Sequence, residues 1–506
     1  PRHVIDGNCL RLSLRKKELL PLCLYRWTSQ WPVCDVLGRR ELLADAAAGA
    51  RGAAVGVALI LLDDDSAAAE AVFLQIVGRR AADRPAADND HIRHVHHRTP
   101  LRLALSGQLG ADAMASDAMR ESFALCVSCK GCKRECPTGV DMAKMKIEYL
   151  HQHQQRHGLS TKDKLIAYLP RYAPYAAKFS RLLNLRDAIP RLAQWSEEKL
   201  GFSARRPLPK WRPDYFRVNQ SRSDPANGGR DVALFVDTFT TYFEPENARS
   251  ALRVLRAAHY NIHLPRAASS SRPLCCGRTF LSVGLVDEAK KEAQRLVTAM
   301  LPYMEQDIPI VGLEPSCVFT LRDEFPALLG GKEAERLAAQ ALSLEEFLFR
   351  EHQRGQLKLS LYPVYPPRVL IHGHCHQKAA GVMGAVEGTL RLIPDLKLET
   401  IESGCCGMAG AFGYDADHFD ISMQMAELNL LPAVRASDEH TTIVADGVSC
   451  RQQIRDGSGR KALHGARGLE TALRSGWGAA FRPCPARSQY PRAFWLIEYF
   501  LGKAVQ

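Results

Sequence analysis

Short apolar runs divide the C-terminal half of the chain into two similar parts. The run VALFVDT at 232–238 resembles VLIHGHC at 369–375, and each passes from apolar residues into a polar loop. Continuous apolar runs of this length predict buried parallel strands. Helical stretches are predicted to follow at 247–258 and 380–392, as the first helix of each part.

A second helix and a closing strand complete each part. The predicted helices are 286–304 and 416–434, and the predicted strands are 308–313 and 442–445. The order strand, loop, helix, loop, helix, strand therefore occurs twice, which predicts two pseudo-repeated α/β modules. We place these modules at 231–356 and 357–465.

Cysteine spacing adds metal chemistry to this picture. In CVSCKGCKRECP, the residues Cys126, Cys129, Cys132 and Cys136 have the C-x2-C-x2-C-x3-C-P spacing of a [4Fe–4S] ferredoxin site. Cys136 either closes that cluster or serves a neighbouring one. Zinc sites usually take two separated C-x2-C pairs, and disulfides suit secreted chains. The spacing therefore predicts a helical ferredoxin-type domain, which we place at 101–203.

Each module also carries a CCG triplet. The triplets are Cys275-Cys276-Gly277 and Cys405-Cys406-Gly407. Glycine permits the sharp turn and close approach that let two adjacent thiols face one metal centre.

The remaining cysteines make the two modules unequal. Both have a Ser-Cys pair after the triplet, which contributes Cys317 to the first module and Cys450 to the second. Only the second has Cys375, because the matching position of the first is Thr238. We therefore expect a complete thiolate set in the second module alone. His372, His374 and His376 surround Cys375, where they could tune a cluster by hydrogen bonds to sulfur or relay protons.

Together these motifs resemble the C-terminal iron–sulfur part of flavin-linked D-2-hydroxy acid dehydrogenases, the D-lactate, glycolate and D-2-hydroxyglutarate type. The phrases LCVSCKGCKRECPTGVDMAKMKIEYL, LEPSCVFTLRDEFP, HGHCHQKA and ESGCCGMAGAFGY carry the resemblance, which covers 101–463. The CCG repeat is also similar to that of the glycolate oxidase iron–sulfur subunit, heterodisulfide reductase and the anchor subunit of anaerobic glycerol-3-phosphate dehydrogenase.

The resemblance implies an oxidoreductase component that passes electrons from flavin through [4Fe–4S] clusters to a quinone or another acceptor. The expected metal ligands are Cys126, Cys129, Cys132, Cys136, Cys275, Cys276, Cys317, Cys375, Cys405, Cys406 and Cys450. FAD is expected on a flavoprotein domain or subunit outside this chain, which shows no phosphate-cradling glycine loop. The alternative is a heterodisulfide-reductase-like enzyme whose CCG cluster acts on a disulfide.

Charge and composition refine the expected partners and compartment. The net charge of +12 comes from 67 basic and 55 acidic residues spread along the chain, so we expect no nucleic-acid partner. Cysteines gathered in metal motifs favour the reducing cytoplasm. Basic and aromatic residues alternate at 162–195, among prolines that break any long helix. This segment indicates either packing against a flavin domain or the chain's own CCG modules, for which it is the candidate docking surface, or a peripheral contact with the inner face of a membrane.

Three segments lie outside the modules. Residues 1–100 begin with proline and give no helix or strand pattern, and Cys9, Cys23 and Cys34 match no cluster motif. We expect either a poorly specified, frame-shifted segment or a divergent, disordered leader. The segment 204–230 is expected to be a linker, and the tail 466–506 is not assigned.

Overall fold

The computed structural model describes residues 23–28, 31–36, 57–59, 104, 106–108, 110, 113, 116–217, 228–268 and 272–473. The chain divides into two compact units, Pro1–Thr99 and Pro100–Gln506. All eleven cysteines expected to bind metal lie in the second unit.

The first unit contains an antiparallel sheet. Its strands are β1 (Cys23–Thr28), β2 (Trp31–Val36) and β3 (Val57–Leu59), in the order β2-β1-β3. The sequence alone shows no helix or strand pattern in this stretch, and its assignment as a poorly specified leader stays a prediction. Cys9 lies outside the described residues.

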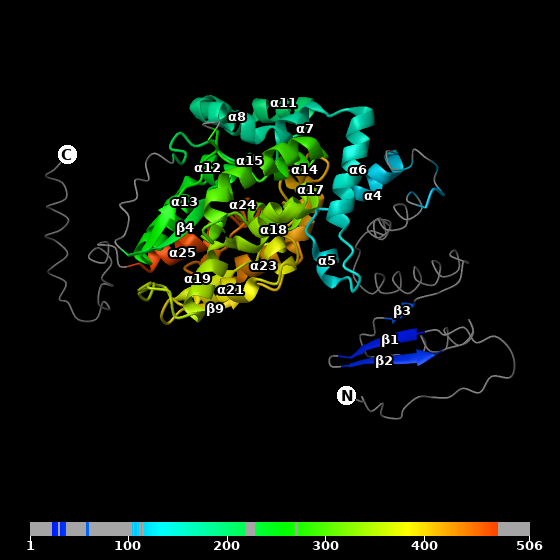
Figure 1. Cartoon of the computed structure of the whole chain (residues 1–506). Coiled ribbons are helices and arrows are strands. Elements are labelled where there is room, and N and C mark those ends of the chain that lie inside the picture. The colour runs from blue at the N-terminus through cyan, green and yellow to red at the C-terminus, as the bar shows by residue number, and fades with distance from the viewer. Residues whose placement is uncertain are drawn as a thin grey trace, which may run out of the picture. The chain divides into compact units, whose positions relative to one another are not determined.

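Two parallel sheets form the centre of the second unit (Figure 1). The first contains β4 (Arg230–Phe235), β5 (Tyr260–His263), β6 (Ile310–Gly312) and β7 (Ala341–Ser343), in the order β5-β4-β6-β7. The second contains β8 (Arg368–Ile371), β9 (Lys397–Thr400), β10 (Thr442–Val444) and β11 (Ala462–Leu463), in the order β11-β10-β8-β9. When the four strands of each sheet are numbered by their order in the chain, they lie side by side in the order second, first, third, fourth in both sheets. The coarse prediction of mixed helices and parallel α/β sheets is confirmed.

The apolar runs form strands that are buried on both faces. Val232 and Leu234 of β4 enter one hydrophobic core, whereas Ala233 and Phe235 enter another on the opposite face. Alternate residues of a strand point to opposite faces, so a continuous apolar run covers both sides of the sheet.

Helices cover these faces. Those of the first sheet are α12 (Thr238–Tyr242), α13 (Pro245–Ala257), α14 (Arg278–Leu281), α15 (Val286–Met304), α16 (Pro315–Phe319), the π-helix η5 (Thr320–Glu324), α17 (Phe325–Leu329), α18 (Gly331–Gln340) and α19 (Leu344–Gln353). Those of the second are α20 (Cys375–Ala379), α21 (Met383–Leu390), η6 (Phe412–Tyr414), α22 (Phe419–Glu427), α23 (Leu430–Ala436), α24 (Val448–Ser458) and α25 (Gly465–Thr471).

Several elements differ from the prediction. The predicted helix 416–434 is two helices, α22 and α23, because the backbone leaves helical geometry at Asn429. Strands β5, β7, β9 and β11 were not predicted, since they span only two to four residues and lack a long apolar run. Helix α25 crosses the predicted module boundary at 465.

The two sheets are joined by reciprocal helix packing. Helix α13, beside the first sheet, contacts α25 of the second, and α21 of the second contacts α19 of the first. By position in the repeat, α13 corresponds to α21 and α19 to α25. Each of the two contacts therefore joins the second helix of one module to the last helix of the other. Such a reciprocal arrangement is typical of an isologous interface.

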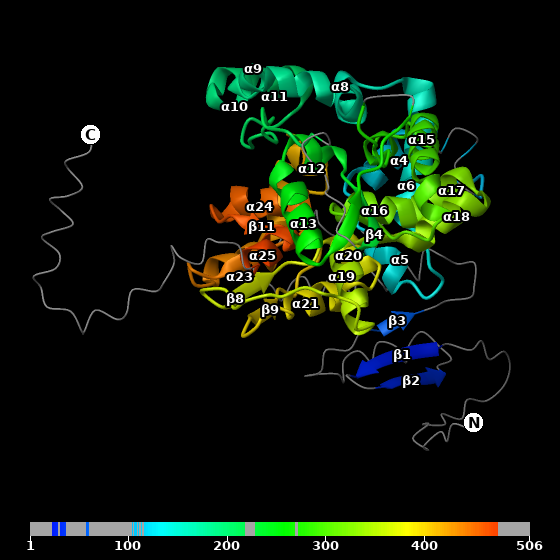
Figure 2. The same cartoon turned by 60° about the vertical axis from the view of Figure 1, so that its left-hand side comes forward.

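Helices between 117 and 200 precede the sheets. They are α4 (Asp117–Ala124), α5 (Gly131–Glu135), α6 (Met142–His157), α7 (Thr161–Ala167), α8 (Leu169–Ala176), η3 (Ala177–Phe179), α9 (Ser180–Leu183), α10 (Leu185–Ala188) and α11 (Pro190–Leu200). Pro170 lies in the first turn of α8 and Pro190 begins α11, so prolines divide the segment as predicted. Helices α8 to α11 run along one edge of this unit (Figure 2). Among the described helices, none is long and apolar enough to span a bilayer.

Candidate iron–sulfur sites

Cysteines of the second module meet at the carboxyl ends of two paired strands. Cys375 is the first residue of α20, which follows β8, and Cys450 lies in the first turn of α24, which follows β10. Strands β8 and β10 are adjacent and parallel, and the chain leaves them in opposite directions along the sheet. Doubly wound sheets bind their ligands at this switch point.

The CCG triplet brings two more thiols to this place. The Cys405 side chain contacts those of Cys375 and Cys406, and Cys406 also contacts Cys450. The four sulfurs therefore form one continuous group. A ring nitrogen of His372 and the sulfurs of Cys406 and Cys450 lie within 4.8 Å of one another.

This arrangement separates the four thiols into two kinds. A hydrogen bond from Cys405 lowers the pKa of Cys375, and hydrogen bonds from Cys405 and Cys450 lower the pKa of Cys406. The same contacts raise the pKa values of Cys405 and Cys450. Thiolates are the form that ligates metals, so the second module already holds two groups inclined to that form.

His374 supports the thiolate of Cys375. Burial alone would lower the pKa of His374, but Cys375 and Glu314 raise it to about 9. A ring with a raised pKa thus lies beside a thiol with a lowered pKa. Imidazolium next to cysteine is a common way to stabilise a thiolate.

Among the described cysteines, three thiols come together in the first module. The Sγ atoms of Cys276 and Cys317 lie 3.1 Å apart, and Cys275 contacts Cys276. The contact with Cys276 raises the pKa of Cys275, and the pKa of Cys276 is raised as well. The position that matches Cys375 is Thr238, which is buried at the start of α12. This module therefore offers neither a fourth thiol at that position nor a group inclined to ionise.

Glycine shapes both triplets. Gly277 and Gly407 have φ of 76° and 83°, in the left-handed region that favours glycine. A Cβ at Gly407 would lie 2.2 Å from the backbone oxygen of Ser422 on α22. The turn that presents Cys405 and Cys406 thus requires glycine both for its backbone angle and for close packing.

The ferredoxin-type run forms the loop between α4 and α5 and then α5 itself, which carries Cys132. Cys126, Cys129 and Cys132 lie close enough for their charges to interact. Ser128 and Lys130, on either side of Cys129, have φ of 52° and 61°, and these left-handed residues wrap the chain around the thiols. Cys136 ends α5, where its Sγ lies 3.1 Å from Thr138 Oγ1.

This loop contacts the second module beside its cysteines. Cys129 interacts electrostatically with Cys375. His376 Nε2 lies 3.1 Å from the Ser128 carbonyl oxygen, and Arg134 donates to the carbonyl of Lys378 at 2.6 Å. Burial lowers the pKa of His376 to about 3, so its neutral ring donates to Ser128. Two cysteine groups far apart in the sequence are thus neighbours.

Buried ion pairs fix the same loop to the first module. Lys130 is 5% exposed and pairs with Asp323 and Glu324 of η5. Lys133 and Lys144 also bind Asp323, each at 2.8 Å. Although burial raises the pKa of Asp323, these three lysines lower it well below its ordinary value. The carboxylate is therefore ionised whenever the loop is docked.

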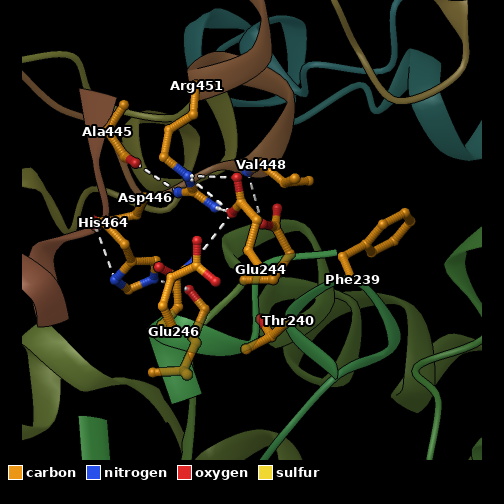
Figure 3. A network of polar contacts seen from close by, with 12 residues as sticks. Phe239, Thr240, Glu244, Glu246, Ala445, Asp446, Val448, Arg451 and His464 are labelled. Carbon is orange, nitrogen blue, oxygen red and sulfur yellow. Dashed lines mark hydrogen bonds and ion pairs between the residues drawn. The ribbon is translucent and has the colours of Figure 1, made fainter. Parts of the chain in front are cut away.

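A polar network joins the two modules (Figure 3). Arg451 of α24 pairs with Glu244, which precedes α13, and donates to the Ala445 carbonyl at 2.7 Å. Glu314, the N-cap of α16, also accepts from the Val448 backbone N–H at 2.9 Å. One carboxylate therefore caps both α16 and α24, the two helices that carry Cys317 and Cys450.

Another buried group, Glu345, Asp446 and His464, has ligand atoms within 4.8 Å of one another. Asp446 accepts hydrogen bonds from Gln377 and from the Gly465 backbone, and His464 Nδ1 accepts from the Ala466 backbone. Asp446 and His464 are thus already engaged in holding α20 and α25, which indicates a structural role.

The residues present fit iron–sulfur clusters. Thiols are the ligands that such clusters prefer, and the four of the second module converge without a disulfide among the described cysteines. Two charged residues beside these thiols, Lys378 and Arg206, were missed in the sequence. Lys378 stands one helical turn after Cys375, which local spacing could have shown, whereas Arg206 is distant in the chain and gave no signal.

Comparison with known proteins agrees with the resemblance seen in the sequence. No protein-family model matches the chain. It is 26% identical over 319 residues to the C subunit of anaerobic glycerol-3-phosphate dehydrogenase from Escherichia coli, covering 62% of this chain and 78% of that protein. It is 23% identical over 367 residues to D-2-hydroxyglutarate dehydrogenase of Escherichia coli, covering 70% of this chain and 34% of that protein.

A third relative extends the comparison. Lactate utilization protein A of Bacillus velezensis is 24% identical over 189 residues, covering 36% of this chain and 74% of that protein. The predicted relationship to components of dehydrogenases is confirmed by these matches. The chain spans about a third of the length of D-2-hydroxyglutarate dehydrogenase.

Proposed function

We propose that this chain is the iron–sulfur electron-transfer component of a flavin-linked dehydrogenase. Cys126, Cys129 and Cys132 would hold one [4Fe–4S] cluster, with Cys136 completing it or a neighbour. Cys375, Cys405, Cys406 and Cys450 would hold another. The observation that supports this most strongly is the proximity of Cys129 to Cys375, which makes the two cysteine groups neighbours.

The first module would hold no complete cluster. Its three thiols have raised pKa values, and Thr238 stands where a fourth ligand is needed. Clusters of this type, when bound, accept and release single electrons. The chain's own contribution is to fix the distance between the two cysteine groups, through His376, Arg134 and the lysines around Asp323.

The substrate of the complex is proposed from the relatives. Glycerol-3-phosphate dehydrogenase and D-2-hydroxyglutarate dehydrogenase, as their names state, oxidise secondary alcohols that carry an anionic group. Flavin accepts the hydride in such reactions and the protein component relays electrons. We therefore propose a flavoprotein partner that carries FAD and oxidises a D-2-hydroxy acid or a similar alcohol, with a quinone or another carrier as acceptor.

The experiment is anaerobic reconstitution followed by iron, sulfide and paramagnetic-resonance analysis. Wild-type protein should show two distinguishable reducible signals. Cys375→Thr, which copies Thr238 of the first module, should remove one signal, and Cys129→Ser should remove the other. Cys275→Ser is the matched control and should leave both. Zinc without acid-labile sulfide in the wild-type protein would exclude this proposal.

Activity is tested with the same preparation. D-lactate, glycolate, D-2-hydroxyglutarate and glycerol 3-phosphate should be oxidised only when a flavoprotein partner is added, with an artificial acceptor. Turnover by the isolated, flavin-free chain would refute the relay role. Cleavage of a disulfide substrate by that chain would favour the heterodisulfide-reductase-like alternative.

A surface on α8 to α11 is the proposed membrane contact. Eight of the eleven exposed large apolar side chains of the described residues fall between Tyr175 and Trp195. The exposed charged residues within that stretch are the cations Lys178, Arg181 and Arg191. Apolar side chains flanked by cations suit the surface of an anionic bilayer. We therefore propose that the complex lies against the inner face of the cytoplasmic membrane.

A further inference from the structure

A buried arginine reaches the candidate cluster site of the second module from outside that module. Arg206 is 1% exposed and belongs to the segment that follows α11. Ser203 donates to the Tyr414 carbonyl at 2.8 Å, which fixes this segment to the loop after the CCG triplet. The guanidinium therefore has a defined position inside the second module.

The Arg206 guanidinium touches both cysteine-bearing segments. Its Nη1 contacts the sulfur of Met408, next to Gly407, and donates to Gln453 Oε1, each at 2.6 Å. Gln453 lies on α24, one turn after Cys450. Cys406 is among the charged groups that act on Arg206.

Little negative charge balances this arginine. Its ion pair among the described residues is with Asp456, whose Oδ2 lies 3.9 Å from Nε. Asp456 also pairs with Arg455, and burial raises its pKa. The other side chains that its guanidinium is shown to contact are uncharged: the sulfurs of Met408 and Met423, the amide of Gln453 and the ring of Phe419. A buried cation without a close anion is costly, so a further anion is expected nearby.

Lys378 contacts the CCG loop at its other end in sequence. Its Nζ donates to the carbonyl oxygens of Ser403 and Gly404, immediately before the CCG triplet. All four thiols of the second module act electrostatically on it. Among the ion pairs of the described residues, none joins Lys378 to a carboxylate.

The first module shows the opposite arrangement. Strand β4 pairs with β6 in the same register in which β8 pairs with β10, so the two modules can be aligned residue by residue. In this alignment Thr241 matches Lys378. Its arginines near Cys275, Arg272 and Arg295, both pair with the carboxylate of Glu292. Between the two CCG modules, cations with little or no carboxylate compensation therefore accompany the four thiols of the second module and not the three of the first.

We propose that Arg206 and Lys378 balance the negative charge of the second-module cluster and set its reduction potential. This inference rests on the proposed cluster ligands. A cluster held by four thiolates is anionic, and reduction adds another negative charge. Nearby cations stabilise the reduced form more than the oxidised form, so they raise the potential. Both residues act through the field at the cluster and through the position of the CCG loop.

The test is a redox titration of the reconstituted full chain, followed by paramagnetic resonance. Arg206→Gln and Lys378→Gln should each reduce the ratio of reduced to oxidised cluster about tenfold at a fixed solution potential, a shift of about 59 mV to lower values. Arg295→Gln is the matched control, because its cation is already paired, and it should leave the potential unchanged.

The outcomes separate this inference from the proposed function. Absence of the second-module cluster in the wild-type chain would reject the ligand assignment itself. A normal cluster with unchanged potential in both glutamine variants would overturn the charge-balance inference. If Arg206→Gln takes up no cluster, Arg206→Lys is the deciding variant. Cluster uptake by Arg206→Lys at a near wild-type potential would support a role for the charge of Arg206. Failed uptake would show that Arg206 acts through packing and would overturn the charge-balance role proposed for it.

Discussion

At the scale of single residues, ionisation distinguishes thiols that sequence motifs treat alike. Both modules contain a CCG triplet and a Ser-Cys pair. Only the second has cysteines with a lowered pKa, because Cys405 and Cys450 can donate hydrogen bonds to Cys375 and Cys406. In the first module, the pKa of Cys317 is about 12.

We predict that Cys375 is the thiol of the CCG modules that iodoacetamide modifies first in metal-free protein. It is partly exposed and has a low pKa, whereas Cys275, Cys276 and Cys317 are buried with raised values. The rate at which iodoacetamide modifies Cys375 should change little from pH 6 to 8. Burial raises the pKa of Cys129, so the rate of modification of Cys129 should rise about tenfold per pH unit. Mass spectrometry of modified peptides measures both.

Cluster loading provides the control for this experiment. Reconstituted protein should be protected at Cys375, and removal of iron by a chelator should restore modification. Equal modification of Cys375 in loaded and metal-free protein would show that it is not a ligand.

At the scale of elements, the CCG turn depends on glycine geometry. We predict that Gly407→Ala destabilises the protein and prevents iron uptake in the second module, because its Cβ would lie 2.2 Å from Ser422 O. Gly410→Ala is the matched control, with φ of 65° and no atom within 4 Å of the added Cβ. The free energy of unfolding of the control should fall only by the cost of placing a non-glycine residue in the left-handed region, about 1–2 kcal/mol. Urea unfolding and iron content would show whether the two variants differ.

A largely buried ion pair, Arg451 with Glu244, is one of the contacts that join the two modules. We predict that Arg451→Met lowers the free energy of unfolding by about 3–5 kcal/mol, because it leaves Glu244 without its partner. Arg253→Met is the control. Arg253 also joins the modules through Glu470, but it is exposed, so the loss should be about 1 kcal/mol or less.

The pH dependence follows from the direction of the Glu244 shift. Burial opposes ionisation, but Arg451 lowers the pKa of Glu244 below its ordinary value. The pair therefore stabilises the fold above the unfolded pKa of about 4.3, and this contribution is lost as pH falls through the folded value. The gap between wild type and Arg451→Met should narrow as pH falls, because protonation relieves the unpaired carboxylate of the variant and removes the ion pair of the wild type. A gap that widens on acidification would contradict the assignment.

At the scale of the whole molecule, the apolar edge formed by α8 to α11 is the feature most exposed to a partner. We predict that the chain binds vesicles with anionic lipid and binds neutral vesicles more weakly, with salt reducing the difference. The double variant Phe179→Glu and Leu182→Glu should weaken binding more than tenfold, because each side chain loses burial worth about 1.5–3 kcal/mol. Vesicle cosedimentation measures this.

Tyr365→Glu is the matched control, because Tyr365 is 91% exposed but lies outside this edge. It should bind vesicles like the wild-type chain. If neither vesicle type binds and the double variant instead loses affinity for the flavoprotein partner, the edge is a protein-docking surface.

The sequence alone determined the features that depend on local pattern. The apolar runs gave strands β4, β6, β8 and β10, because burial on both faces needs continuous apolar side chains. Cysteine spacing identified the candidate ligands, and prolines divided 162–195 into short helices. The absence of a fourth thiol at Thr238 was also visible, since the repeat aligns residue by residue.

Only the tertiary structure decided what lies beside these cysteines. The short strands β5, β7, β9 and β11 form by pairing with neighbours rather than by their own pattern. The approach of Cys129 to Cys375 and the insertion of Arg206 beside Met408 join residues more than two hundred positions apart. Local periodicity carries no information on such contacts, because they arise from the packing of separate elements and from charges that are matched only after folding.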